Sequence, residues 1–303
     1  MSGLSPTATS PTRVFLVGSP RSGTTLLQSL LASHPKLTSF PETHFFLIVT
    51  PRPEERWRRK LGIASSDAPE ALERLAALGI TENAASDDRR RLVTLRQYAR
   101  LLTRTLDQAA ATAGSTHWLE KTPNHLHYSH VIERYVSGAR FVHMIRDGRA
   151  VIASNFEVRQ KHPTWGGAVT LDVAIDKWHW SIRRSLACLG RQDHFFVSYE
   201  RLVAAPRAVL SRLCGHLGLP VSDRQVDQML NGYAGQQHRL GGYAERGPEG
   251  VITGEEPWKE TVGGPIENRN DEKFMALFDS DQRALIERAV ATEDQAITAI
   301  PFV

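Results

Sequence analysis

The sequence lacks the features that define several large classes of protein. Its only two cysteines, Cys188 and Cys214, exclude a disulfide framework or a multi-cysteine metal site, and we expect two buried, reduced thiols. Apolar runs such as Val14–Val17 are far shorter than the roughly 18 residues that a membrane-spanning helix needs. Residues 1–12 are rich in Ser, Thr and Pro and lack the basic and apolar segments of a secretory signal. These absences predict a cytoplasmic protein without a membrane span.

Charge of one sign is also scarce. The chain has 37 Lys and Arg against 33 Asp and Glu, a net charge of +4, in 303 residues. There is no basic tail and no basic face interleaved with aromatics, so we expect no nucleic-acid partner. Most of the cations are arginines, and the guanidinium fork matches the oxygens of a phosphate group. The composition therefore fits a globular protein with a small anionic ligand.

Short apolar runs alternate with helical patterns along much of the chain. The expected strands are 13–17, 117–120, 139–145 and 194–198, and the helices that follow them are 24–33, 124–135, 148–158 and 206–217. Strands that alternate with helices in this way favour a parallel sheet covered by helices on both faces. The predicted fold class is therefore α/β.

We expect a single domain over residues 13–303, preceded by a flexible tail at 1–12. Two segments interrupt the alternation. Residues 51–115 are charged and helical, and include an amphipathic pattern that Gly114 terminates, formed by Leu92, Leu95, Ala99, Leu102 and Leu106. Residues 231–268 are rich in glycine and have no periodicity, which predicts a long C-terminal loop that acts as a lid. The basic cluster Arg56–Lys60 is expected to be a solvated helix face.

A glycine-rich loop, Gly18–Thr25 (GSPRSGTT), connects the first expected strand to its helix. In such a loop the backbone amides and the helix N-terminus converge on an anion. The spacing is that of G-x-x-x-x-G-K-S/T, but Thr24 occupies the lysine position. That lysine normally contacts the β- and γ-phosphates, so its absence argues against a nucleotide triphosphatase. The loop amides, the Thr24 and Thr25 hydroxyls and the Arg21 guanidinium remain to bind one phosphate.

The segment Pro20–Thr25 resembles the phosphosulfate-binding loop of sulfotransferases that use 3′-phosphoadenosine 5′-phosphosulfate (PAPS), which has the form P-K/R-S-G-T-T. The continuation LLQSLLASHP…FPETHFF is similar to the tyrosylprotein and bacterial branch of that family. The resemblance implies a P-loop-like sheet. It also implies that PAPS is bound at its 5′-phosphate and sulfuryl group by Arg21, Ser22, Gly23, Thr24 and Thr25.

A second group of residues follows the strand expected at 139–145. Arg146 comes at its carboxyl end, and Ser154 follows eight residues later. Ligands of open parallel sheets bind beyond the carboxyl ends of the strands, so we expect Arg146 at the same edge as the glycine-rich loop. An Arg and a Ser at this spacing also match the family's 3′-phosphate signature. The neighbouring Asp147 and Arg149 are expected to form an internal ion pair.

The resemblance assigns two more residues to the donor. Tyr199 matches a tyrosine near the adenine, although a tyrosine at this position is equally compatible with the core. Lys259, in PWKETVGGP, matches a basic loop that closes over the 3′-phosphate, with Arg239 and Arg246 as alternatives. The cytosolic branch stacks a tryptophan on the adenine just after its loop. This sequence has Leu26 and Leu27 there, so the stacking partner is unassigned.

The same resemblance suggests the catalytic groups. A glutamate at the position of Glu42 is the general base in the related branches, and a carboxylate in a partly dry pocket can have the raised pKa that suits this role. His44, two residues further on, is a rival base. Lys121, in LEKTPNH, matches a second cation that acts with Arg21 on the sulfuryl oxygens without a metal.

The sequence therefore predicts transfer of a sulfuryl group from PAPS to a hydroxyl, which yields a sulfate ester and adenosine 3′,5′-bisphosphate (PAP), with no metal required. Small-molecule, carbohydrate, lipid and tyrosyl-peptide acceptors all remain open, and so does the oligomeric state. The alternatives are a P-loop phosphotransferase or kinase and a non-catalytic nucleotide-binding module.

Overall fold

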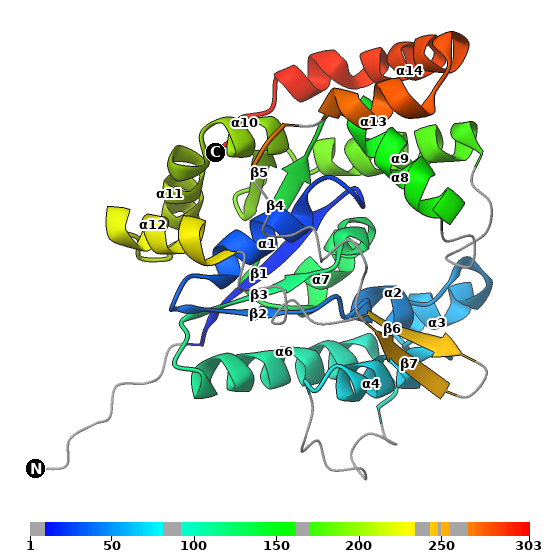
Figure 1. Cartoon of the computed structure of the whole chain (residues 1–303). Helices are drawn as coiled ribbons and strands as arrows, with labels where there is room; N and C mark the ends of the chain where they lie inside the picture. The colour runs from blue at the N-terminus through cyan, green and yellow to red at the C-terminus, as the bar shows by residue number, and fades with distance from the viewer. Residues whose placement is uncertain are drawn as a thin grey trace, which may run out of the picture.

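The structure, a computed structural model, describes residues 10–80, 92–161, 170–233, 243–247, 250–254, 266–268 and 270–303. In this part of the chain five strands form one sheet, in which every paired neighbour is parallel and the order is β2-β3-β1-β4-β5. The strands are β1 (Thr12–Gly18), β2 (Leu37–Phe40), β3 (His117–Lys121), β4 (Ala139–Ile145) and β5 (His194–Ser198). The predicted parallel α/β sheet is confirmed, and β1 lies at its centre (Figure 1).

Alternate side chains of β1 point to two separate cores, as the period of two along a strand requires. Val14 and Leu16 pack against the helices of one face, α1 (Thr24–Ala32), α10 (Tyr199–Ala204), α11 (Pro206–Leu217) and α12 (Asp223–Gly232). Phe15 and Val17 pack on the other face against α2 (Phe45–Val49), α4 (Ala68–Ala77), α6 (Leu95–Thr112), η2 (Pro123–Tyr128) and α7 (Ser129–Tyr135). Helices thus cover both faces of the sheet (Figure 1).

A third core lies beyond the end of β4 and completes the described architecture. It is formed by α8 (Gly148–Lys161), α9 (Leu171–Leu186), α13 (Asn270–Leu277) and α14 (Ser280–Thr298). Trp178 on α9 is at its centre, against Gly148, where an added Cβ would lie 2.6 Å from the indole ring. This close approach fixes the beginning of α8 beside the loop at the end of β4.

Most sequence-based boundaries are correct to within one to three residues, and the exceptions are informative. The predictions missed β2, and the helix expected at 124–135 is a 3₁₀ segment, η2, followed by α7. Strand β1 includes Thr12, which was expected in the tail. Within the segment 231–268, expected to be a loop, β6 (Tyr243–Gly247) and β7 (Gly250–Gly254) form an antiparallel pair next to α4 (Figure 1).

Among the described residues of the 51–115 region, three short helical segments precede the long helix: η1 (Pro53–Glu55), α3 (Arg56–Leu61) and α4. None of the α3 residues is buried, as expected for the basic cluster. The long helix is α6, which begins at Leu95 because Thr94 caps it in a capping box with Gln97. Leu92 therefore lies before the helix instead of within it. After α6, Gly114 adopts the left-handed conformation, with φ of 68°, that ends the helix as predicted.

The burial of α6 leads to a stability prediction. Leu106 is fully buried (0% exposed), so Leu106→Ala leaves a cavity and should lower the free energy of unfolding by about 2–5 kcal/mol. Urea denaturation monitored by circular dichroism measures this change. The control is Leu61→Ala on α3, where the side chain is 67% exposed and the effect should stay within about 0.5 kcal/mol. Equal effects of the two substitutions would contradict the assignment of the α6 face.

Candidate active site

The glycine-rich loop turns sharply between β1 and α1, and glycine is required at both ends of the turn. Gly23 has a φ of 97°, and an added Cβ would lie 2.5 Å from the ring of Tyr199. Gly18 has a φ of 154°, and its Cβ would lie 2.6 Å from the carbonyl oxygen of Met144 on β4. Between them Arg21 takes the left-handed conformation, with φ of 72°. The loop is thus pressed against β4 and α10, with the N-terminus of α1 behind it.

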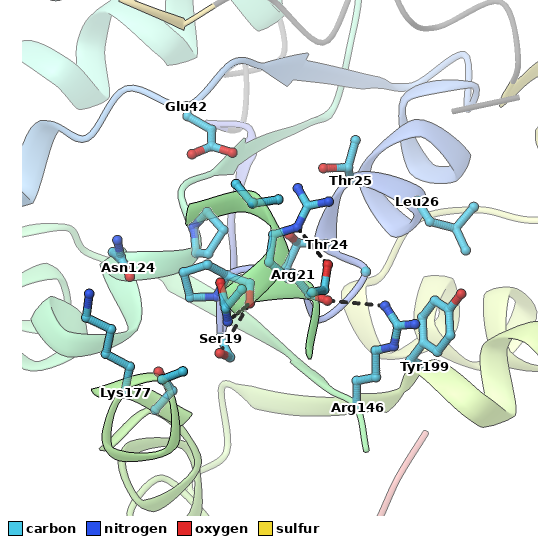
Figure 2. Close-up of a pocket in the computed structure, with 18 of the residues that line it drawn as sticks. Ser19, Arg21, Thr24, Thr25, Leu26, Glu42, Asn124, Arg146, Lys177 and Tyr199 are labelled. Atoms are coloured by element: carbon cyan, nitrogen blue, oxygen red, sulfur yellow. Dashed lines mark hydrogen bonds between the residues drawn. The ribbon is translucent and has the colours of Figure 1, made fainter. Parts of the chain in front are cut away.

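A cavity of about 640 Å³ lies at the carboxyl ends of the strands and includes this loop. That volume is in the usual range for small-molecule sites. The predicted site residues among its lining are Arg21, Gly23, Thr24, Thr25, Glu42, Arg146, Ser154 and Tyr199. In Figure 2, Glu42 lies on one side of the loop, Arg146 and Tyr199 lie together at one end, and Lys177 and Asn124 lie at the other.

Arg146 connects the elements around the loop, as its position at the end of β4 predicts. Its Nη1 donates to the carbonyl oxygen of Arg21 at 3.2 Å, and its Nε donates to Asn270 Oδ1 at 2.9 Å. The guanidinium carbon lies 4.1 Å from the centroid of the Tyr199 ring. Burial lowers the pKa of Arg146, while Tyr199 and nearby carboxylates oppose this shift. The side chain is a buried cation that the fold fixes on several sides.

Ser154, on the second turn of α8, lies within reach of the same loop. Its hydroxyl accepts from Arg21 Nε at 3.2 Å, and the following residue, Asn155, donates through Nδ2 to the Pro20 carbonyl at 3.1 Å. The structure therefore brings Arg21, Arg146 and Ser154 together. The predicted Asp147–Arg149 ion pair is present at 2.7 Å.

A triad of ionisable side chains, of which only Lys121 is buried, is centred on the carboxylate of Glu42. Lys121 Nζ forms an ion pair with Glu42 Oε1, and His44 Nε2 lies 3.2 Å from Glu42 Oε2. Glu42 lines the cavity, whereas Lys121 is 1% exposed and lies behind the carboxylate. His44, with a left-handed φ of 53°, also lies outside the lining of the cavity. Of the three groups, the carboxylate of Glu42 is thus the one that faces a ligand.

The pKa of Glu42 is shifted in the direction opposite to our sequence expectation. Burial by itself raises the pKa, but the positive charge of Lys121 and the hydrogen bond from His44 outweigh burial and hold it far below its ordinary value. The carboxylate is therefore ionised at neutral pH. Sequence reasoning considered only burial and overlooked the cation that the fold places against Glu42.

A fully buried carboxylate, Glu120, positions this triad. It accepts from the backbone N–H of Thr43 at 3.1 Å, the Thr43 hydroxyl at 2.8 Å, the Thr122 hydroxyl at 2.5 Å and His125 Nδ1 at 2.9 Å. His125 in turn accepts from the backbone N–H of Phe46 through Nε2 at 3.1 Å. These bonds tie the segment after β2 to the end of β3. Glu42 and Lys121, the neighbours of Thr43 and Glu120, meet as a result.

Sequence reasoning missed a set of cavity residues that only the fold brings together. They are Asn124, His127, Asn155, Arg159, Lys177, Trp180, Tyr233 and Ile266. Of these residues, only Asn155 lies next to a residue of a recognised motif, Ser154 of the Arg146–Ser154 pair, and could have been predicted from it. Lys259 and Arg239 lie outside the described residues, as does the side chain of Arg246, so the lysine remains a prediction.

Away from the cavity, His143, Cys188 and His194 place their ligand atoms within 4.8 Å of one another. His143 Nε2 lies 2.8 Å from His194 Nδ1, and His194 Nε2 lies 2.8 Å from Glu133 Oε1. His143, His194 and Glu133 thus form a hydrogen-bonded chain from β4 through β5 to α7, and Cys188 lies beside this chain without being part of it. Cys188 and Cys214 are both free and buried, as expected, and burial raises the pKa of the Cys214 thiol to about 12.

The fold is P-loop-like, and its glycine-rich loop has Thr24 at the position of the phosphate-binding lysine. The chain matches the model of the sulfotransferase family over residues 11–223, well over half of its length. It therefore belongs to the sulfotransferase family and is a sulfotransferase. This finding confirms the resemblance drawn from Pro20–Thr25.

Individual relatives agree with this assignment. The chain is 28% identical over 219 residues to a Caenorhabditis briggsae protein named "Putative protein-tyrosine sulfotransferase", a match that spans 70% of this chain and 68% of that protein. Among solved structures, the sulfotransferase domain of a Synechococcus olefin synthase has a TM-score of 0.59 at 24% identity and covers 96% of this chain and 98% of its own. A mouse sulfotransferase complexed with PAP has a TM-score of 0.55 at 11% identity, over 95% and 86% of the two chains. Both structures share the fold.

No helix in the described ranges is long and apolar enough to cross a membrane. This agrees with the short apolar runs of the sequence.

The Glu120 network leads to a pH-dependent prediction. Burial raises the pKa of Glu120, but the charge of His125 and the hydrogen bonds to the carboxylate lower the pKa by more than burial raises it. The pKa in the folded protein is therefore below the ordinary value. The stabilisation is therefore complete above the ordinary glutamate pKa of about 4.3 and is lost as the pH falls through the folded value. Glu120→Gln should lower the free energy of unfolding at pH 7 by about 3–5 kcal/mol.

Urea denaturation of both proteins at pH 7, 5 and 3.5 tests this prediction. The difference between wild type and Glu120→Gln should be constant from pH 7 to 5 and smaller at pH 3.5. Glu54→Gln, at an exposed carboxylate on η1, is the matched control and should change stability little at every pH. If the difference in the free energy of unfolding between wild type and Glu120→Gln instead grows as the pH falls, Glu120 does not have a lowered pKa in the folded protein.

Proposed function

We propose that this sulfotransferase transfers the sulfuryl group of PAPS to a hydroxyl acceptor. The observation that carries the proposal is that one cavity joins the anion-binding loop, the Arg146–Ser154 pair and an ionised carboxylate, Glu42. The products are a sulfate ester and PAP. A phosphotransferase is less well supported because Thr24 replaces the lysine that such enzymes use on the β- and γ-phosphates.

The donor fits the end of the cavity that contains the loop. The amides that precede α1, together with the Thr24 and Thr25 hydroxyls, would hold the 5′-phosphate. The hydroxyl of Ser22 is buried, has no hydrogen-bond partner among the described residues and lies outside the lining of the cavity. Arg146 and Ser154 would hold the 3′-phosphate, as the family signature implies. The adenine would lie in the apolar corner formed by Leu26, Tyr199, Tyr233 and Ile266.

Glu42 is the proposed general base. The acceptor oxygen forms a bond to sulfur as the bond from sulfur to the 5′-phosphate oxygen breaks, and the hydroxyl proton passes to the Glu42 carboxylate. Negative charge develops on the leaving phosphate, where Arg21 and the N-terminus of α1 stabilise it. Glu42 is favoured over His44 because Glu42 lines the cavity and His44 does not.

Lys121 has a different role in this proposal from the one that the family resemblance implies. Since Lys121 is buried behind Glu42, it acts by keeping that carboxylate ionised, while Arg21 remains the cation at the sulfuryl group. At neutral pH the Glu42 carboxylate is ionised and can accept a proton, but its low pKa also makes it a weaker base than a glutamate with a raised pKa.

The reaction itself is tested by incubation with labelled PAPS and extracts that contain candidate acceptors. Mass spectrometry should reveal a product heavier than its precursor by one SO₃, together with PAP. A protein that binds PAPS but never forms such a product would instead be a nucleotide-binding module.

The assignment of Arg146 and Ser154 predicts a preference for PAP over AMP. Loss of a charge-assisted contact typically costs about 1.5–3 kcal/mol, so PAP should bind about 10- to 150-fold more tightly in calorimetry. Arg146→Ala should abolish the preference and Ser154→Ala should reduce it. Arg104→Ala, on the exposed side of α6, is the control and should retain it. Equal affinities of the wild-type protein for PAP and AMP would refute the assignment.

The base assignment predicts unequal effects at positions 42 and 44. Glu42→Gln retains the shape of the side chain but cannot accept the proton, so turnover at saturating substrates should fall by about 10²–10⁴-fold while PAP affinity changes little. His44→Gln should cost much less. Circular dichroism verifies folding, because Glu42→Gln leaves Lys121 without its carboxylate. If His44→Gln abolishes turnover and Glu42→Gln does not, then His44 is the base.

A further inference from the structure

The end of the cavity opposite the nucleotide residues contains two cations. Figure 2 shows Lys177 directed toward Asn124 at one end, while Arg146 and Tyr199 occupy the other. Arg159, on α8, lines the same cavity. In the described part of the chain neither Arg159 nor Lys177 has an ion-pair or hydrogen-bond partner. In contrast, Arg146 is held by a carbonyl and an amide oxygen.

The two cations line one cavity and are close enough to affect each other; Arg159 is half-buried, whereas Lys177 is exposed to solvent. Nη1 of Arg159 has no access to solvent and no hydrogen-bond partner among the described residues. Burial and the positive charge of Arg159 together lower the pKa of Lys177. A buried donor such as Arg159 Nη1 is normally hydrogen-bonded, and leaving it without a partner is unfavourable. An anion between the two side chains would satisfy both.

The adjacent wall of the cavity is aromatic and uncharged. His127 and Trp180 stack in parallel, with ring centroids 3.4 Å apart and planes at 7°. Burial lowers the pKa of His127 to about 4, with a further contribution from Arg184, so the imidazole is neutral at pH 7. Trp180 is 61% exposed at the opening of the cavity. A flat, apolar body can rest on this wall while an anionic group reaches the cations.

We propose that Arg159 and Lys177 bind a carboxylate of the acceptor, whose hydroxyl then faces Glu42. The inference rests on the proposed function and narrows its acceptor to small hydroxy-carboxylates with a flat, apolar body. A carboxylate fits because the guanidinium fork can bind both of its oxygens, while the ammonium group of Lys177 supplies a third donor. The phosphates of the donor have their own partners at the opposite end of the cavity.

Two probes that differ only in this charge test the proposal: 4-hydroxyphenylacetate and its neutral counterpart, 4-hydroxyphenylacetamide. Binding of each is measured by calorimetry, with the free enzyme and with the enzyme saturated with PAP, and turnover is measured with PAPS. The carboxylate should bind about 10- to 100-fold more tightly than the amide, as expected for charge-assisted hydrogen bonds. The same preference should appear in kcat/KM.

Variants on two separate helices test whether Arg159 and Lys177 cause the preference for the carboxylate probe over the amide probe. Arg159→Gln on α8 and Lys177→Met on α9 should each reduce the ratio of the two affinities by about tenfold. Lys60→Met, which removes an exposed cation on α3 outside the cavity, is the matched control and should retain the full ratio. Because the readout is a ratio measured on one protein, a general loss of folded protein does not imitate the effect.

Equal binding of the two probes, or binding of neither, would overturn the proposal. A preference that persists in both Arg159→Gln and Lys177→Met would also overturn it, because the anion would then bind elsewhere. Failure of the proposed function gives a different result from failure of this acceptor proposal. In that case PAP does not bind or PAPS is not consumed, while the free enzyme still prefers the carboxylate.

Discussion

The buried carboxylate of Glu120 is the constraint on which the rest of the site depends. A charge in the interior of a protein requires partners, and Glu120 finds them in Thr43, Thr122 and His125. These partners belong to separate segments, the turn after β2 and the chain after β3, and the hydrogen bonds hold the segments in one arrangement. The contact between Glu42 and Lys121 follows from it, since each is the chain neighbour of a residue in the network. The hydrogen bonds between Thr43 and Glu120 therefore determine where the neighbouring Glu42 lies and which cation it contacts.

The cations at the two ends of the cavity differ in whether other protein groups hold them in place. At the end that we assign to the nucleotide, Arg146 is held by Asn270, by the Arg21 carbonyl and by the ring of Tyr199, so its geometry is fixed before a ligand binds. Hydrogen-bond donors that are held in place suit a ligand that is the same in every reaction, as we propose for the nucleotide that carries the sulfuryl group. At the other end Arg159 and Lys177 have no such partners in the described structure. Cations without partners suit a ligand that supplies the missing charge, which is the basis of the acceptor proposal.

Lys121 and Lys177 illustrate how position decides what a lysine does. Lys121 ends β3 and is buried against Glu42, where its charge lowers the pKa of a neighbouring carboxylate. Lys177 lies on α9 and lines the cavity, where partial desolvation and then the charge of Arg159 lower the pKa of Lys177. One cation therefore tunes the proposed base, and the other is available to a ligand. The distinction arises from packing, because residue type is the same in both cases.

The sequence by itself determined the parallel sheet, the glycine-rich loop, and the approach of Arg146 and Ser154 to that loop. These features depend on local patterns, such as short apolar strands and glycines at a turn, and on the rule that parallel strands end at one edge of the sheet. Only the tertiary structure decided the rest. It added β2 and α9, reversed the expected pKa shift of Glu42 by placing Lys121 against it, and brought Arg159, Lys177 and Trp180 to the cavity. No local pattern marks such residues, because their role arises from helices packed together across the fold.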